Sequence, residues 1–313
     1  MQTKIKDSGF TDWSLANLPN LSGKRYFITG GNSGVGFEAA KMLAGAGADI
    51  IIGCRNLIKA QQAVKEIEVV SSGGVVETVA LDLSQKSSVK ECADGLKQRY
   101  DTLDGLINNA GIMMTPQTMT EDGFELQLAT NHLGHFLLAG LLYDLVEAAS
   151  GRIVVVASII HKQGEIHFND LMMKDNYSPV KAYAQSKLAN LMFALELDRR
   201  LQAAGSRVSC IACHPGYSAT NLQATGPFGM IKALMKVLNP LFAQSPVNGA
   251  LPEVLSVAGE EAIAGAYYGP QSMGEARGKV SDAKVASQAL DKEAAVRLWD
   301  ESEKLLDYQW PQL

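Results

Sequence analysis

Short runs of consecutive apolar residues alternate along this chain with longer stretches of helical periodicity. Residues 50–52 and 153–156 are apolar at every position. A strand with one face in water alternates apolar and polar residues, so uninterrupted apolar runs indicate strands that are covered on both faces. The alternation therefore predicts an α/β protein whose parallel sheet lies between two layers of helices.

Seven segments have the length and composition of such strands. They are residues 25–29, 49–53, 77–81, 105–108, 152–157, 208–212 and 264–268. Helices are predicted between them at 37–46, at 57–70 with Asn56 as a candidate cap, and at 183–201. Because parallel neighbours require right-handed crossovers, the expected fold class is α/β with a single Rossmann-type, doubly wound, parallel seven-stranded sheet and helices on both faces.

The continuous alternation indicates one domain with an extension at each end. Residues 1–22 form the predicted N-terminal extension, and residues 23–273 form the predicted Rossmann-fold domain. Residues 274–313 form the predicted C-terminal extension, which ends in a helix at 292–306. Within the domain, residues 216–245 contain no clear strand and are rich in Gly, Pro, Leu, Met and Phe, which indicates an insertion.

Composition and charge narrow the classes of function. The 313 residues are 47% hydrophobic and 19% charged, with a formal net charge of -5. A nucleic-acid-binding protein would carry a basic excess, so no nucleic-acid partner is expected. The sequence also lacks the roughly 18 consecutive apolar residues of a transmembrane helix. Since residues 1–22 lack the apolar core of a signal peptide, the cytoplasm is the expected location.

The four cysteines are too few for a secreted domain built on disulfides. Cys210 and Cys213 form a C-x-x-C pair, which is compatible with a redox site or half of a metal site. No second pair follows, however, and residues 207–213 have the pattern of a buried strand. We therefore expect inert core thiols and no metal site.

A glycine-rich turn joins the first predicted strand to the first predicted helix. It reads Thr29-Gly30-Gly31-Asn32-Ser33-Gly34-Val35-Gly36. Glycine permits positive φ angles and close backbone approach, and a helix N-terminus offers free N–H groups to a pyrophosphate. The turn therefore predicts a dinucleotide-binding site, although a ligand-free βα turn would have the same composition.

The end of the second strand bears on which dinucleotide is bound. An acidic residue there would bind the ribose 2′-hydroxyl group, whereas an arginine favours a 2′-phosphate. The sequence Gly53-Cys54-Arg55-Asn56 has no acid, and a guanidinium group can bind a phosphate through two hydrogen bonds. NADP(H) is therefore favoured over NAD(H), which stays open, as does a solvated surface arginine.

Two further strand ends carry candidate cofactor contacts. Asp82 follows the third strand, where it could bind an adenine amino group or cap a helix near Ser84. The fourth strand ends in Asn108-Asn109-Ala110-Gly111, whose small residues would let a cofactor approach the backbone. Open α/β sheets bind ligands in this crevice.

Tyr183 and Lys187 are four residues apart and share one face of a predicted helix. A free tyrosine has a pKa of about 10, too high for efficient acid–base catalysis at neutral pH. An ammonium group about 4 Å away would stabilise the phenolate by on the order of 4 kcal/mol, and so lower this pKa by up to roughly three units. The pair predicts an acid–base group, although a surface tyrosine beside a surface lysine has the same spacing.

The order of these motifs resembles that of the short-chain dehydrogenase/reductase family. From about residue 23 to 268 the chain carries, in order, the glycine-rich turn, Asp82, Asn108 to Gly111, Asn131, Ser158, Tyr183 with Lys187, and His214-Pro215-Gly216 with Thr220. Four further features resemble the retinol-dehydrogenase-like branch: the Gly53 to Asn56 ending, the position of His161, the wide gap from Ser158 to Tyr183, and the ending Leu298-Trp299 to Trp310-Pro311. One departure is Ala157-Ser158, where the family often has two serines.

The resemblance implies a role for each matched residue. Tyr183 would be the acid–base residue, and Lys187 would hold the nicotinamide ribose and tune Tyr183. Ser158 would bind the substrate oxygen, and Asn131 would anchor a water of the proton path. The implied cofactor contacts are Gly30, Asn32, Ser33, Gly34, Val35, Gly36, Arg55, Asn56, Asp82, Leu83, Asn109, Ala110, Gly111, Tyr183, Lys187, Pro215, Gly216 and Thr220.

In this family the segment after Pro-Gly binds substrate, so residues 216–245 are the expected substrate flap. Their apolar composition suits a small lipophilic carbonyl or alcohol substrate, although core packing, a subunit contact or a membrane-surface helix would also explain it. The expected activity is that of an NADP(H)-dependent oxidoreductase. The alternatives are a non-catalytic NADP(H)-binding sensor or scaffold, and another reaction on the same cofactor such as double-bond reduction. A monomer and a homodimer both stay open.

Overall fold

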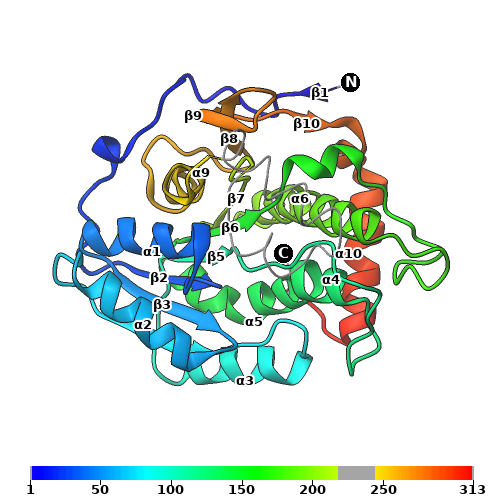
Figure 1. Cartoon of the computed structure of the whole chain (residues 1–313), viewed down its shortest axis with the longest axis horizontal. Helices are drawn as coiled ribbons and strands as arrows, with labels where there is room; N and C mark the ends of the chain where they lie inside the picture. The colour runs from blue at the N-terminus through cyan, green and yellow to red at the C-terminus, as the bar shows by residue number, and fades with distance from the viewer. Residues whose placement is uncertain (1, 218–243, 312–313) are drawn as a thin grey trace.

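The computed structural model describes residues 2–217 and 244–311 (Figure 1). Within these residues the main sheet has eight strands: β2 (Arg25–Thr29), β3 (Asp49–Cys54), β4 (Val76–Ala80), β5 (Gly105–Asn108), β6 (Arg152–Val156), β7 (Ser209–Cys213), β8 (Tyr267–Ser272) and β9 (Arg277–Asp282). Their order is β4-β3-β2-β5-β6-β7-β8-β9, and all pairs except β8 with β9 are parallel. From β2 the chain first builds the sheet outward through β3 to β4, and then returns to the other side of β2 with β5. This reversal of strand order confirms the predicted doubly wound topology.

The eighth strand is the difference from the predicted seven-stranded sheet. β9 pairs antiparallel with β8, and its first three residues are exposed. Its sequence therefore lacks the apolar run that marks the other strands. β8 also extends through Pro270 to Ser272, with an irregular register there, whereas the sequence predicts a strand end at residue 268.

Helices cover both faces of the sheet, as the apolar runs predict. Helices α1 (Gly34–Gly45), α2 (Leu57–Glu68) and α9 (Pro246–Ala258) pack on one face, and α3 (Lys86–Lys97), α5 (Gly134–Ala148) and α6 (Pro179–Ala203) pack on the other. Alternate residues of β3 belong to different cores: Ile50 and Ile52 face α1, whereas Ile51 lies in the core with α3 and α5.

Polar caps fix where the helices begin. The side chain of Asn56 accepts a hydrogen bond from Lys59 N at 2.9 Å, so the predicted cap of α2 is confirmed. Helix α6 begins at Pro179, earlier than predicted, because Ser178 caps it and proline is favoured in a first turn. Helix α10 (Lys292–Leu306) has the predicted bounds and is capped by Asp291.

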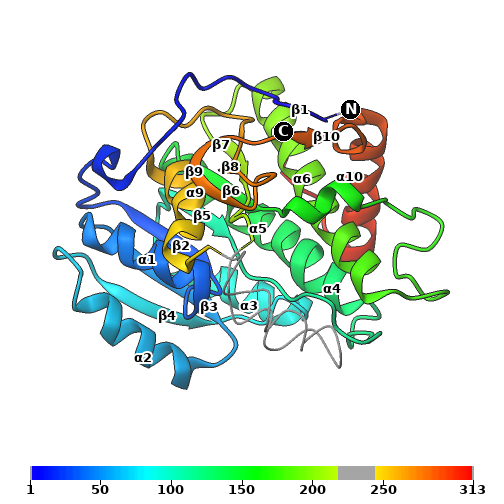
Figure 2. The ribbon, with the colours of Figure 1, turned by 45° about the horizontal axis from the view of Figure 1, so that its top comes forward.

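The two ends of the chain are attached to the main body. Figure 2 shows α10 beside α6. Trp299 of α10 and Trp310 beyond it pack edge-on against Phe136 of α5. At the other end, β1 (Gln2–Thr3) pairs with β10 (Val285–Ala286), and the Ser8 backbone N–H donates to Asp282 at 2.9 Å. Residues before the alternating region therefore meet β9 and β10, which follow it.

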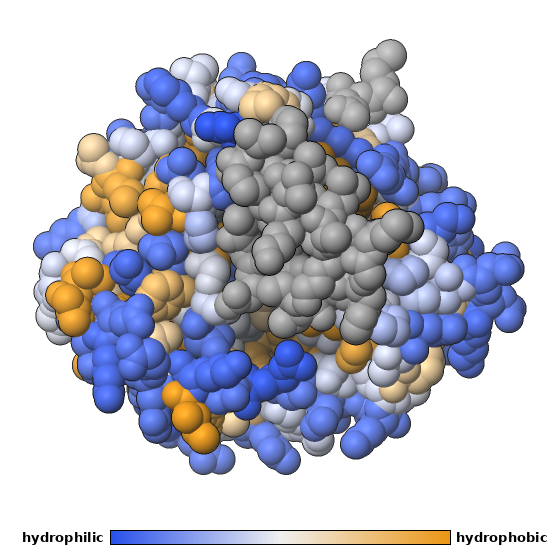
Figure 3. All heavy atoms as spheres, viewed as in Figure 1, coloured by the Kyte–Doolittle hydropathy of each residue, from blue (hydrophilic) through white to orange (hydrophobic). Residues whose placement is uncertain are grey.

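Figure 3 shows one face of the molecule, on which hydrophobic residues form separate groups among hydrophilic ones. None of the helices in the described ranges is both long enough and apolar enough to cross a membrane.

Cys210 and Cys213 are free, fully buried thiols, and burial raises the pKa of both, so the prediction of core thiols is confirmed.

Candidate active site

A cavity of about 1170 Å³ follows the carboxyl ends of the parallel strands and includes the point where the strand order reverses. Most residues predicted to contact a cofactor or a substrate line it: Gly30, Asn32, Ser33, Gly34, Val35, Arg55, Asn56, Asp82, Leu83, Asn109, Ala110, Gly111, Ser158, Tyr183, Lys187, Pro215 and Gly216. Two predicted residues, Gly36 and Asn131, lie behind the lining. Thr220 and most of the predicted flap lie outside the described residues.

The glycine-rich turn has the backbone geometry that a dinucleotide requires. Gly30 and Gly34 have φ angles of 69° and 62°, which L side chains rarely adopt. A Cβ atom on Gly30 would lie 3.0 Å from the Ala110 Cβ. Helix α1 begins at Gly34 beside the cavity, so its free N–H groups can face a phosphate. The turn therefore fits a pyrophosphate group.

Gly36 serves packing rather than the cavity surface. A Cβ atom on Gly36 would lie 3.0 Å from the Asn109 Cγ and closer still to its Nδ2. That amide nitrogen donates to Thr29 O at 2.6 Å. The absence of a side chain at Gly36 therefore lets α1 approach the strand end that holds Asn109.

The end of β3 presents two cations to the cavity. Arg55 lines it as predicted, and so does Lys59, which the sequence analysis missed. Lys59 lies four residues after Arg55, in the first turn of α2. This spacing was the sequence signal that could have indicated a second cation beside Arg55. Asp82 is the only carboxylate among the described lining residues. It accepts hydrogen bonds from the Ser84 N–H and hydroxyl groups at 3.0 and 2.6 Å, so it braces the turn before α3 as well as facing the cavity.

Ser158, Tyr183 and Lys187 meet at the other end of the cavity. Ser158 follows β6 and caps the short 3-10 helix Ile159–Gln163. Tyr183 lies on α6 and lines the cavity together with Ser158. One turn further along α6, Lys187 Nζ donates to Val156 O at 2.9 Å. The structure thus brings together three of the four predicted catalytic residues.

Burial dominates the electrostatics of this group. It raises the pKa of Tyr183, and the nearby Ser158 side chain only partly offsets the rise. Burial also lowers the pKa of Lys187 to about 8, against the attraction of Glu253 and Cys213. The predicted lowering of the Tyr183 pKa by Lys187 is therefore wrong for this structure, because desolvation disfavours the phenolate. Burial therefore favours the neutral phenol at this position.

Asn131 lies just behind this group, in the single π-helical turn Ala129–Leu133 before α5. Its side chain is fully buried and binds both backbone groups of Ile112, at 2.8 and 2.9 Å. Its Nδ2 also donates to the Ser186 hydroxyl at 2.9 Å. Asn131 therefore joins the loop after β5 to α6, next to Lys187.

A buried chain that the sequence analysis missed connects Asn131 to the glycine-rich turn. His135 Nδ1 donates to Asn131 O at 2.9 Å, and His135 Nε2 accepts from the Thr29 hydroxyl at 2.8 Å. The Thr29 hydroxyl in turn accepts from the backbone N–H groups of Asn109 and Ala110, at 3.0 and 2.9 Å. Burial lowers the pKa of His135 to about 3, so the ring is neutral. The position of Thr29 at the start of the glycine motif was the only signal in the sequence.

Sequence comparisons identify related proteins. Residues 24–227 match the sequence family described as short chain dehydrogenase. The chain is 39% identical to retinol dehydrogenase 12 of Mus musculus over 300 residues, which cover 93% of this chain and 88% of that protein. It is 39% identical to retinol dehydrogenase 13 of Homo sapiens over 306 residues, 95% and 88% of the two chains.

Solved structures share the fold. A crystal structure of an uncharacterised protein from Mycobacterium paratuberculosis is 38% identical, with a TM-score of 0.80 over 96% of this chain and 100% of that chain. A short chain dehydrogenase from Burkholderia cenocepacia, solved with NADP, has a TM-score of 0.60 at 24% identity, over 79% and 96% of the two chains. The chain belongs to the short-chain dehydrogenase/reductase family, in its retinol-dehydrogenase-like branch, and is an oxidoreductase that acts on alcohol or carbonyl groups.

Proposed function

We propose that this protein transfers hydride between NADP(H) and a small lipophilic carbonyl or alcohol compound, with Tyr183 as the acid–base residue. The observation that carries the proposal is the meeting of Ser158, Tyr183 and Lys187 in one cavity with the glycine-rich turn. The names of the relatives, retinol dehydrogenases, support an elongated apolar aldehyde or alcohol as the substrate class.

The residues of the cavity fit a dinucleotide that carries an additional phosphate. The N-terminus of α1 and the turn at Gly30 and Gly34 would hold the pyrophosphate. Arg55 and Lys59 would bind the 2′-phosphate of NADP(H). The described lining residues of β3 and α2 include no carboxylate that would instead bind the ribose 2′-hydroxyl group of NAD(H). Asp82 and Leu83 would frame the adenine. When bound, the cofactor supplies or accepts the hydride.

The protein's own side chains would handle the proton. As a neutral phenol, Tyr183 can donate its proton to the carbonyl oxygen of a substrate during reduction. The Ser158 hydroxyl would donate a hydrogen bond to the same oxygen and stabilise its developing charge. Lys187 carries its charge below pH 8 and would stabilise the phenolate left behind. Asn131, one layer deeper, would anchor the water that returns the proton.

Apolar side chains lie beside this group and suit a lipophilic substrate. Those of Met113, Met114, Ile159 and Ile160 line the cavity. Methionine adapts its shape to different apolar ligands at little cost, which favours a range of chain lengths. This proposal includes a substrate flap at residues 216–245. It also includes the extensions predicted at residues 1–22 and 274–313. The cytoplasmic location stays a prediction.

A screen of cofactors and aldehydes tests the proposal. Purified protein is given NADPH or NADH with aldehydes of increasing chain length, including retinal, and loss of the reduced cofactor is followed by absorbance. We expect turnover with NADPH that increases with the apolar length of the substrate. A Tyr100→Phe variant, altered at a tyrosine bonded to Glu77 and absent from the cavity lining, serves as control and should retain activity. Absence of turnover with every aldehyde, together with tight NADPH binding, would instead favour a sensor.

A further inference from the structure

The turn between β8 and β9 forms part of the cavity wall and has an unusual backbone. Met273, Gly274 and Glu275 have consecutive φ angles of 51°, 67° and 69°. Only glycine adopts this left-handed region cheaply, so surrounding contacts must hold the two other residues there. Gly274 and Ala276 line the cavity. The contacts that fix this turn therefore also shape the cavity.

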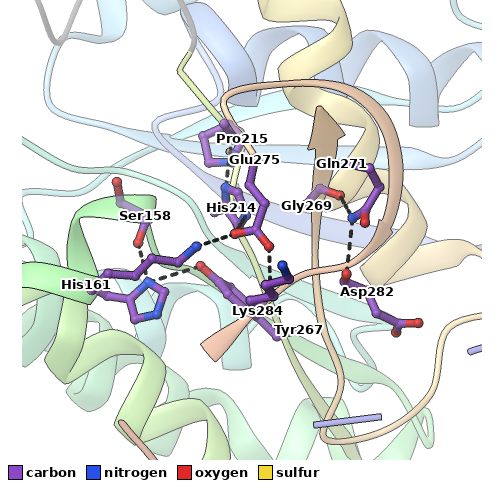
Figure 4. A network of polar contacts seen from close by, with 12 residues as sticks. Ser158, His161, His214, Pro215, Tyr267, Gly269, Gln271, Glu275, Asp282 and Lys284 are labelled. Carbon is purple, nitrogen blue, oxygen red and sulfur yellow. Dashed lines mark hydrogen bonds and ion pairs between the residues drawn. The ribbon is translucent and has the colours of Figure 1, made fainter. Parts of the chain in front are cut away.

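The buried carboxylate of Glu275 supplies those contacts (Figure 4). Its Oε2 accepts from Lys162 Nζ at 2.6 Å, and its Oε1 accepts from the Lys284 backbone N–H at 2.8 Å. The Lys162 and Glu275 side chains are only 15% and 8% exposed. Solvent therefore screens this ion pair less than an exposed one. Because removing one partner would leave the other charge buried, the two residues should act as a unit.

Lys162 belongs to the short helix that begins directly after Ser158. His161, its neighbour, bonds through Nδ1 to Ser158 O at 2.7 Å, and its Nε2 accepts from the Ala286 N–H at 3.3 Å. This pairing places the ring proton on Nδ1, and burial lowers the pKa of His161 to about 4, so the ring stays neutral. Through Lys162, Glu275 therefore holds the short segment that begins at Ser158.

The carboxylate also faces the segment that follows β7. The Gly216 N–H donates to His214 Nδ1 at 3.1 Å, so His214 carries its proton on Nε2, which lies 3.9 Å from Glu275 Oε2. The Ala276 carbonyl accepts from the Tyr217 N–H at 2.7 Å. Three cavity segments, after β6, after β7 and between β8 and β9, therefore converge on one carboxylate.

We propose that Glu275, with Lys162, is a positioning residue that sets the separation between Ser158 and the opposite wall of the cavity formed by Gly274 and Ala276. The inference rests on the proposed function, because Ser158 is there the residue that binds the substrate oxygen. Loss of the pair would let both walls shift. The substrate carbonyl would then be oriented less often toward Ser158 and Tyr183, while the cofactor end near Gly30 and Arg55 would be unaffected.

Kinetics of matched variants test this role. We expect Glu275→Gln and Lys162→Met each to lower kcat/KM for the aldehyde at least tenfold. The NADPH Kd should rise no more than threefold, because the glycine-rich turn and Arg55 lie outside the segments that Glu275 holds. The double variant should be no worse than either single variant, because the two residues act as a unit. Lys162→Arg keeps the charge and should retain activity within threefold. The control is Lys279→Met, which breaks the exposed ion pair between β9 and Asp12 and should leave kcat/KM unchanged.

Several outcomes would overturn the inference: kcat/KM within twofold of wild type in Glu275→Gln, a double variant whose loss is the product of the single losses, or the same loss in Lys279→Met. If wild type turns over no aldehyde, the proposed function fails instead. Hydrogen exchange of the backbone at residues 158–164 then decides the inference. Faster exchange in Glu275→Gln than in Lys279→Met supports it, and equal exchange refutes it.

Discussion

Replacing Gly36 with alanine tests whether the glycine-rich turn is built for close packing on Asn109. The added Cβ would lie 3.0 Å from the Asn109 Cγ and closer to its Nδ2. Overpacking of this kind costs about 1–3 kcal/mol, and displacing the amide from Thr29 O at 2.6 Å adds about 1 kcal/mol. Alanine regains up to about 1 kcal/mol of helix propensity in α1. The net loss in the free energy of unfolding is therefore about 1–3 kcal/mol.

The assay is thermal unfolding, with NADPH affinity measured alongside. For a chain of this length the expected fall in Tm is about 2–5 °C, and NADPH should bind more weakly because Asn109 lines the cavity. Gly95→Ala in α3 is the matched control, because no heavy atom lies within 4 Å of its added Cβ, and it should raise Tm slightly. If Gly36→Ala is as stable as Gly95→Ala and binds NADPH as well as wild type, the packing argument is wrong.

Two further predictions concern charge. Arg55→Ala and Lys59→Ala should each weaken NADPH binding by about 10- to 100-fold and leave NADH binding unchanged, measured by titration of both cofactors. Lys65→Ala, at an exposed position of α2, is the control. Equal losses of NADH affinity would contradict the 2′-phosphate assignment. Burial raises the pKa of Glu253 in α9 from 4.5 to about 8, so the folded state holds an extra proton between these pH values and loses stability as pH rises through them. Glu253→Gln should remove this pH dependence and stabilise the protein by up to about 3 kcal/mol at pH 7. The measurement is Tm as a function of pH. If the slope of Tm against pH is the same in the variant as in wild type, Glu253 is not the source of the pH dependence.

The sequence was sufficient for the features that depend on local pattern. Uninterrupted apolar runs located the parallel strands, because burial on both faces leaves no polar position in them. The glycine-rich turn and the Tyr183–Lys187 spacing likewise report local geometry, a turn and one helix face. These features therefore appear in the structure nearly as predicted.

Features that depend on long-range pairing could not be predicted in this way. β9 is polar and becomes a strand only because β8 offers it an edge. The bond between His135 and Thr29 joins residues 106 positions apart, and the ion pair of Lys162 with Glu275 joins residues 113 apart. The direction of the Tyr183 pKa shift was missed for a related reason, since the burial that raises it arises only when α6 packs on the sheet.

In the proposed reaction Tyr183 transfers the proton. The most direct measurement is the single-turnover rate of aldehyde reduction by NADPH in wild type and Tyr183→Phe, which lacks only the hydroxyl group. We expect a rate lower by about 10²–10⁴-fold in the variant, with the NADPH Kd within twofold of wild type. A variant rate within threefold of the wild-type rate would contradict it.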